Sequence, residues 1–214
     1  VGENYLTMKP FIQKQIDDLN LFISTGLPDY NSVKPSNALK ILLAYDIVFR
    51  SNFIFWLMLM KGKERTARGI KVLEDNLKCE IEENHPQLLL NTLVPSFHLF
   101  TDVESMEQVY KDVDSIMLPI IAKEIRSLTI SSTSTDGFFI MAMLENTSLT
   151  FIPWLKQVVE HRLPVRDVTY FNIHGEADKE HASAFLDAAN DEYIQRAITN
   201  GGIDTFRRKM VYSS

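Results

Sequence analysis

Cysteine is nearly absent from this sequence: Cys79 is the single one among 214 residues. One cysteine cannot form an internal disulfide, and a cysteine-based zinc or iron–sulfur site would need several. The composition therefore predicts a protein of a reducing, cytoplasmic compartment. The first residues also lack a basic segment followed by an apolar core, so a secretory signal peptide is not expected.

Runs of positive charge are absent as well. The chain has 22 Lys and Arg against 28 Asp and Glu, with a net charge of −6 and no Lys/Arg-rich run, so nucleic acid is not an expected partner. The most apolar stretch, Ile41 to Met60, includes Asp46 and Arg50. Charges are costly at membrane depth, and we expect a buried helix here rather than a membrane span.

Alternating apolar and polar residues, the pattern of a half-buried strand, are also missing. Helical periodicity dominates, and no linker divides the chain. The sequence predicts one all-α domain over residues 1–214, folded as a bundle of about seven helices. The expected helices cover about 8–24, 36–60, 64–85, 105–128, 137–161 and 166–199, with a partly helical segment at 87–100 and a last helix beginning near Ile203.

The strongest chemical signal is a column of ligand-type residues in the sixth of these helices. His174, Asp178 and His181 occupy positions i, i+4 and i+7, which lie on one helix face. Phe171 and Phe185 extend the same face, so the face is expected to point into the core. Buried charge must be paired or coordinate a metal, and iron accepts both imidazole and carboxylate ligands.

A second signal lies in the third helix, where Glu82 and His85 stand at positions i and i+3. The spacing of an acidic residue and a histidine three positions later thus occurs twice, because Asp178 and His181 repeat it. Doubling of this pattern is typical of carboxylate-bridged di-iron sites in helical bundles.

Glu145 is the third signal. It interrupts an apolar helix that has almost no other charge before Lys156. An isolated buried carboxylate would cost much desolvation energy unless it binds a cation. A carboxylate that bridges two metal ions fits this position.

At these positions the sequence resembles the heme-oxygenase-like di-iron oxidases, an all-helical family that binds no heme. In that family one core helix supplies a Glu and a His, the next a Glu, and a third His, Asp and His. The resemblance implies two Fe(II) ions per chain, O2 as co-substrate, and a ligand set that is also catalytic. The matching residues are Glu82, His85, Glu145, His174, Asp178 and His181.

One departure concerns the first glutamate. Many members place it seven positions before the first histidine, where this chain has Lys78. The closer spacing of Glu82 and His85 resembles the branch that includes the fatty-acid decarboxylase making terminal alkenes. Glu80 is an alternative first ligand, although its angle to His85 on a continuous helix is poor.

The resemblance implies oxidation of a small carboxylic acid, an amino acid or a fatty acid, in a biosynthetic pathway. C–H abstraction, C–C cleavage, desaturation and N-oxygenation are the outcomes in the family. An external electron donor and a homodimer are left open. Helix two and helix five are expected to line the substrate cavity, with Asp46 and Arg50 as a clamp and Phe53 and Met143 as apolar walls. An internal ion pair between Asp46 and Arg50 is the alternative explanation of that pair.

Two other functions stay open at this point. The same fold hosts metal-free enzymes similar to thiaminase II and to the pyrroloquinoline-quinone synthase. Such an enzyme would stay active without iron, and Cys79 would be its simplest candidate nucleophile. A non-enzymatic helical module that recruits a partner is the other alternative, but it leaves the convergent ligand-type residues unexplained.

Overall fold

The computed structural model describes residues 8–99, 103–116, 123 and 133–200, and within these ranges the chain is helical and contains no strand. The prediction of a single all-α domain is confirmed. The elements in order are α1 (Met8–Gly26), η1 (Tyr30–Ser32), α2 (Pro35–Val48), η2 (Phe49–Phe53), α3 (Ile54–Lys63), α4 (Ala67–Glu82), α5 (His85–Leu93), η3 (Val94–Leu99), α6 (Val103–Ile116), α8 (Ser134–Arg162) and α9 (Thr169–Asn200).

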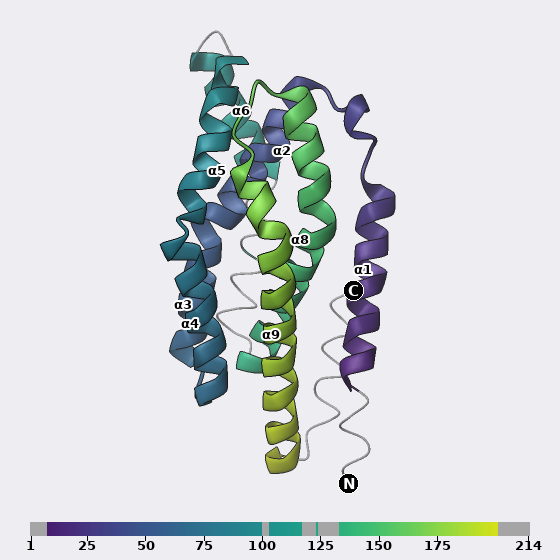
Figure 1. Ribbon diagram of the computed structural model, residues 1–214, viewed down its shortest axis with the longest axis vertical. Coiled ribbons are helices and arrows are strands. Elements are labelled where there is room, and N and C mark those ends of the chain that lie inside the picture. Colours follow the sequence, from purple (N-terminus) through teal and green to yellow (C-terminus); the bar gives the residue numbers. More distant parts are fainter. Residues whose placement is uncertain (1–7, 100–102, 117–122, 124–132, 201–214) are drawn as a thin grey trace.

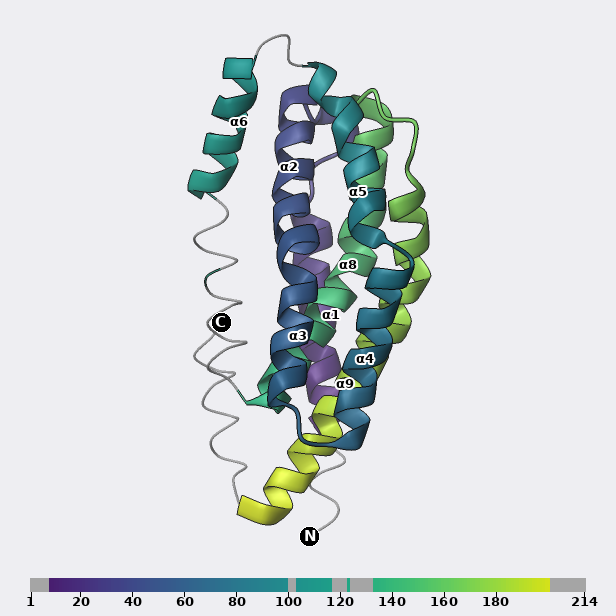
Figure 2. The same ribbon diagram turned by 90° about the vertical axis from the view of Figure 1, so that its left-hand side faces the viewer.

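The helices run roughly along one long axis (Figure 1). The pair α8 and α9 pack against each other over most of their length and form the centre of the bundle. Helix α1 packs on α8, and α4 and α5 pack on α9. Figure 2 shows α2 and α3 in line, with α6 lying outside α2. The predicted helix near Ile203 and the second half of the predicted helix 105–128 lie outside the described residues.

The predicted second helix, 36–60, is one helical run with a defect at its middle. It begins at Pro35, one residue before the predicted start, and Lys34 is its N-cap residue. Proline suits the first helical turn because its missing N–H would have no partner there. The defect is the π-turn η2, where the Asn52 side-chain amide donates to the Ile47 carbonyl at 2.7 Å. Turns of this kind are frequent at functional sites.

The predicted third helix, 64–85, is wrong as a single helix. Helix α4 ends at Glu82 and α5 starts at His85, with Asn84 in the left-handed region at φ 56° between them. Asparagine tolerates this conformation better than most residues. Pro86 falls in the first turn of α5, where it fits, instead of kinking a continuous helix.

Helix α8 extends the predicted segment 137–161 by a few residues, whereas α9 begins at Thr169, later than the predicted start at 166, and ends at Asn200. A capping box between Thr133 and Asp136 fixes the start of α8. By length and composition alone α8 could cross a membrane. Its buried residues pack against neighbouring helices of the bundle, which is also how a core helix of a soluble protein behaves.

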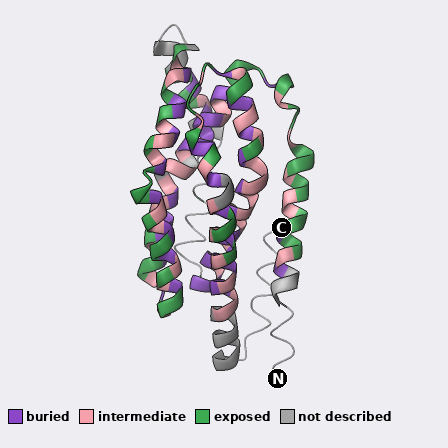
Figure 3. Ribbon diagram, viewed as in Figure 1, coloured by how far each residue is buried: buried purple, intermediate pink, exposed green. Residues whose placement is uncertain are grey.

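The core divides into two apolar clusters. Figure 3 marks the buried residues in purple along the helices. One cluster is built around Leu89, Leu155 and Phe171, and the other around Trp56, Phe138 and Phe185. Helix α9 passes from Phe171 in the apolar cluster around Leu89 to Phe185 in the apolar cluster around Trp56. The segment between them, His174 to His181, therefore forms part of a polar layer between two apolar halves of the core.

Candidate metal centre

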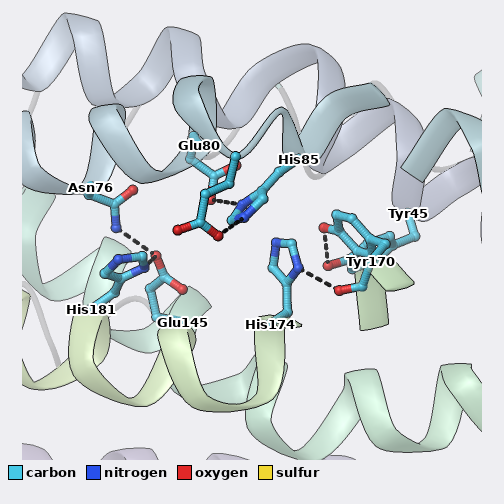
Figure 4. A network of polar contacts seen from close by, with 9 residues as sticks. Tyr45, Asn76, Glu80, His85, Glu145, Tyr170, His174 and His181 are labelled. Carbon is cyan, nitrogen blue, oxygen red and sulfur yellow. Dashed lines mark hydrogen bonds and ion pairs between the residues drawn. The ribbon is translucent and has the colours of Figure 1, made fainter. Parts of the chain in front are cut away.

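The column on α9 faces inward as predicted. His174 is 6% exposed and Asp178 3%, whereas Glu180 on another face is exposed. His174 Nδ1–H donates to the carbonyl oxygen of Tyr170 at 2.8 Å (Figure 4). Because that carbonyl can only accept, Nδ1 carries the proton and the lone pair of the ring lies on Nε2. A histidine held in this way is arranged as metal-binding histidines usually are.

The first ligand cluster joins three helices: Glu80 from α4, His85 from α5 and His174 from α9. One ligand atom of each lies within 4.8 Å of the others. His85 Nδ1 is 3.0 Å from Glu80 Oε1, and the rings of His85 and His174 have centroids 4.4 Å apart. The other nitrogen of His85 faces the exposed carboxylate of Glu83 at 3.2 Å.

Glu82 does not take part in this cluster. Its side chain is 65% exposed and its carboxylate lies 3.7 Å from Lys78 Nζ. The expectation that Glu82 shares an inward face with His85 is wrong, because α4 ends at Glu82 and the chain turns at Asn84 before α5 begins. Glu80, the alternative first ligand, is buried and occupies the place that the sequence pattern gave to Glu82.

The second ligand cluster consists of Glu145 from α8 and Asp178 and His181 from α9. The structure therefore brings five of the six expected residues into two adjacent groups. Asn76, which the sequence reasoning missed, donates its side-chain amide to Glu145 Oε1 at 3.1 Å (Figure 4). Asn76 precedes Glu80 by one turn and is 1% exposed. Its position one turn before a candidate ligand is the only sequence signal that could have identified it.

Burial and neighbouring carboxyl groups raise the pKa of both carboxyl groups of the second cluster. Burial, the nearby charges of Glu145 and Glu80 and a hydrogen bond with Glu145 raise the pKa of Asp178 to about 9. Burial also raises the pKa of Glu145, against the lowering effects of His181 and Asn76. Two buried carboxyl groups in contact cannot both ionise without a cation.

The histidines differ from one another. Burial and the neighbouring charge of His85 lower the pKa of His174 to about 4, so His174 is neutral near pH 7. Burial also lowers the pKa of His85, but the hydrogen bonds and charges of Glu80 and Glu83 outweigh it and the net shift is upward. Burial lowers the pKa of His181 as well, but the negative charge of the adjacent Glu145 outweighs it and the net shift is upward. Several side chains of the polar layer thus favour their protonated forms, and a bound cation would displace those protons.

An unsatisfied atom supports the fit to a metal ion. His181 Nδ1 is buried and has no hydrogen-bond partner, because its distance of 3.6 Å to Glu145 Oε1 is too long for a hydrogen bond. Buried polar groups without partners are rare and call for an explanation. Imidazole nitrogens and carboxylate oxygens together suit iron, whereas the missing thiolates make a structural zinc or iron–sulfur site unsuitable.

The expected substrate-binding residues divide into two groups. Arg50 and Phe53 line the cavity beside the first cluster, together with Phe49 and Tyr45. Asp46 holds Arg50 through two contacts of 2.6 and 2.8 Å, so the internal ion pair that the sequence left as an alternative is present. Met143 does not reach this cavity and packs against the apolar cluster around Trp56 instead.

A pair of buried tyrosines closes the cavity on the side of His174. The hydroxyl oxygens of Tyr45 and Tyr170 are 3.0 Å apart, and the ring of Tyr170 lies over His174 with centroids 3.9 Å apart (Figure 4). Burial raises the pKa of both phenols well above the ordinary value. Both tyrosines therefore stay neutral, and Tyr170 keeps His174 oriented through its carbonyl oxygen and its ring.

Comparison with known proteins adds no relative. No family model matches the chain, no curated protein is similar to it, and no solved structure matches its fold. The heme-oxygenase-like family resemblance consequently depends on the ligand residues alone.

Proposed function

We propose that this chain is a non-heme di-iron enzyme that activates O2 to oxidise a small carboxylic acid. The observation that carries the proposal is the pair of adjacent buried clusters, Glu80 with His85 and His174, and Glu145 with Asp178 and His181. Each cluster offers both imidazole and carboxylate, the ligand mix of oxygen-activating iron sites. Glu80 replaces Glu82 in the ligand set that the family resemblance implied.

When bound, the iron pair would supply the electrons and coordination positions for O2 activation. The protein's own residues prepare the site for it. Tyr170 fixes the tautomer of His174, so Nε2 is free to bind. Asn76 orients the Glu145 carboxylate, and the apolar clusters on both sides exclude water from the layer.

The metal-free alternative finds less support. Burial, with the charges of Glu83 and Glu80, raises the pKa of Cys79 to about 12. A thiol with such a pKa is almost entirely protonated near pH 7, whereas a nucleophilic cysteine needs its thiolate. The charges around Cys79 are negative, which is the opposite of the environment that activates a cysteine.

Anaerobic titration with Fe(II), followed by mixing with oxygenated buffer, tests the proposal. The expected result is binding of about two irons per chain and O2 consumption that depends on added carboxylic acid. His161→Ala is the control for metal binding by histidine in general, because His161 is exposed and far along α8 from the clusters. Iron binding that falls in His161→Ala but persists in His174→Ala would overturn the ligand assignment.

A further inference from the structure

A third group of ligand-type residues lies on the outer side of His85. It consists of Cys79 from α4, Glu83 at the end of α4 and His85 from α5, and one ligand atom of each lies within 4.8 Å of the others. We call this group the outer cluster. It shares His85 with the first ligand cluster, but it also contains a thiol, which neither of the two clusters described above offers.

The helix break that separates Glu82 from the metal centre also builds the outer cluster. Cys79 and Glu83 stand four positions apart, so their side chains share one face at the end of α4. The Cys79 thiol donates a hydrogen bond to the Glu83 carboxylate. The chain then turns through Asn84 at φ 56°, and His85 Nε2 comes to 3.2 Å from Glu83 Oε2. Thiol, carboxylate and imidazole therefore meet at one point of the surface.

His85 has a carboxylate at each ring nitrogen. Nδ1 lies 3.0 Å from Oε1 of the buried Glu80 (Figure 4), and Nε2 faces Glu83 on the opposite side of the ring. A neutral imidazole has one lone pair and one N–H. In one tautomer Nδ1 can bind an ion beside Glu80 while Nε2–H donates to Glu83. In the other, Nε2 can bind an ion beside Glu83 while Nδ1–H donates to Glu80. Both tautomers give the carboxylate–histidine–metal arrangement that orients metal-binding histidines, so the ring can serve either cluster, one at a time.

The outer cluster is open to solvent, whereas the first cluster is not. The Glu83 side chain is 57% exposed and that of His85 is 2% exposed. Cys79 is half-buried, and Glu80 and His174 are buried. On this side of the molecule an ion from solvent therefore meets Glu83 and Cys79 first, and the His85 ring separates it from the first cluster. The carboxylates beside the thiol give this entrance a negative field that attracts a cation.

The ligand set of the outer cluster suits a divalent transition metal. Thiolate, imidazole and carboxylate together bind ions such as Zn²⁺, Co²⁺ and Fe²⁺, and three protein ligands leave a coordination position for water. Mg²⁺ and Ca²⁺ prefer an all-oxygen shell and gain little from sulfur. Because the thiolate is the ligand, binding releases the thiol proton of Cys79 to water.

We propose that Cys79, Glu83 and His85 form a separate capture site for a divalent transition metal, which transfers the ion to the first cluster through His85. During transfer the ring proton of His85 changes from Nδ1 to Nε2, and the ion exchanges the carboxylate of Glu83 for that of Glu80. The Cys79 sulfur takes up a proton from water when the ion leaves, so no electron is gained or lost. Capture is independent of the proposed function, whereas transfer rests on it.

Stopped-flow mixing of the metal-free protein with an excess of Co²⁺ under argon tests both steps. A cobalt–thiolate bond gives an intense charge-transfer band in the near ultraviolet, which imidazole and carboxylate ligands do not give. In the wild type the band should form first and then decay as the first cluster fills and engages His85. His174→Ala and Glu80→Gln each remove a ligand of the first cluster alone, so the band should persist in both. Cys79→Ser should show no band at any time.

The carboxylate of the outer cluster is tested against its neighbour in the sequence. In the His174→Ala background, Glu83→Gln should weaken Co²⁺ binding at the outer cluster by about tenfold or more. Glu82→Gln is the matched control, because Glu82 is an exposed carboxylate that pairs with Lys78 and belongs to none of the three clusters. It should leave the affinity unchanged. Equal effects of the two glutamine variants would overturn the assignment of Glu83.

A protein without the thiolate band in the wild type, in His174→Ala and in Glu80→Gln would overturn the capture site, and Glu83 would then only orient His85. A band that forms and never decays in the wild type would keep the capture site and overturn the transfer. The test uses Co²⁺ and no O2, so it separates the two proposals. A protein that shows the band but consumes no O2 with Fe(II) retains the capture site and loses the di-iron function.

Discussion

The two halves of the candidate metal centre are built on different kinds of backbone. His174, Asp178 and His181 come from α9, which is helical throughout the column. Glu80 and His85 lie on either side of a helix break, with Asn84 in the left-handed region between them. In the α9 half, the residues at positions i, i+4 and i+7 point the same way. In the half formed by α4 and α5, His85 Nδ1 lies 3.0 Å from Glu80 Oε1 although the two residues are five positions apart.

The difference shows where helical periodicity can predict which residues share a face. A spacing of three residues places two side chains on one face only while the helix continues between them. Glu82 is the last residue of α4, and the chain turns before His85. Helical spacing therefore selects the wrong glutamate there, while it selects the correct face along all of α9.

The largest effect is expected on the continuous half. Asp178→Asn removes a candidate ligand and should abolish iron binding at the second cluster. The same change should stabilise the metal-free protein at pH 8. The Asp178 pKa of about 9 lies above its ordinary value, so stability is lost as pH rises between about 4 and 9. An asparagine avoids that loss, and we expect a gain of at least about 1 kcal/mol in urea unfolding.

Glu180→Gln is the control for Asp178→Asn, because Glu180 is an exposed carboxylate on the same helix. It should change neither iron binding nor the dependence of stability on pH. A metal-free Asp178→Asn protein that is less stable than the wild type at pH 8 would contradict the buried, protonated state of Asp178.

The pH dependence of iron affinity should also distinguish the two ligand clusters. Iron must displace the proton that Asp178 holds at neutral pH, so affinity at the second cluster should rise at least about tenfold per pH unit and at least about a hundredfold from pH 6 to 8. His174 is already neutral in this range and releases no proton. Anaerobic competition titrations at several pH values would measure the slope. A second site whose affinity does not change with pH would be inconsistent with this protonation.

A smaller effect is expected where α4 contacts the second ligand cluster. Asn76→Ala removes the hydrogen bond to Glu145 and should weaken iron at the second cluster by about ten- to a hundredfold. The first cluster should keep its affinity. Asn91→Ala on α5 is the control. Asn91 is exposed, and its side chain accepts a hydrogen bond from Gln87 on the same helix. Equal weakening of both irons by Asn76→Ala would show a general loss of packing instead.

The smallest effect concerns the break itself. Asn84→Val places a β-branched residue in the left-handed region and should cost about 1–2 kcal/mol of stability, with a several-fold loss of affinity confined to the first cluster. Asn84→Gly should cost little, because glycine adopts this conformation freely. Urea unfolding of the two variants measures the contrast. If valine and glycine behave alike, the chain does not require the left-handed turn.

Much of this arrangement could be predicted from the sequence. The all-α fold, the inward column on α9 and the isolated Glu145 follow from periodicity and from the cost of burying charge. Glu80 could not be preferred to Glu82 as a ligand, since that choice depends on where α4 ends. Asn76 could not be assigned to the site, since its role depends on which face of α4 meets α8. The π-turn at Phe49 could not be predicted either, because a continuous apolar run indicates an uninterrupted helix.

Iron stoichiometry in the paired variants Glu80→Ala and Glu82→Ala tests the metal centre most directly. Anaerobic Fe(II) titration of the wild type should give about two irons per chain. Glu82→Ala should match the wild type, because that side chain is 65% exposed and pairs with Lys78. Glu80→Ala should lose tight binding at the first cluster while the second cluster still binds. Loss of iron in Glu82→Ala with full binding in Glu80→Ala would contradict the site as the structure arranges it.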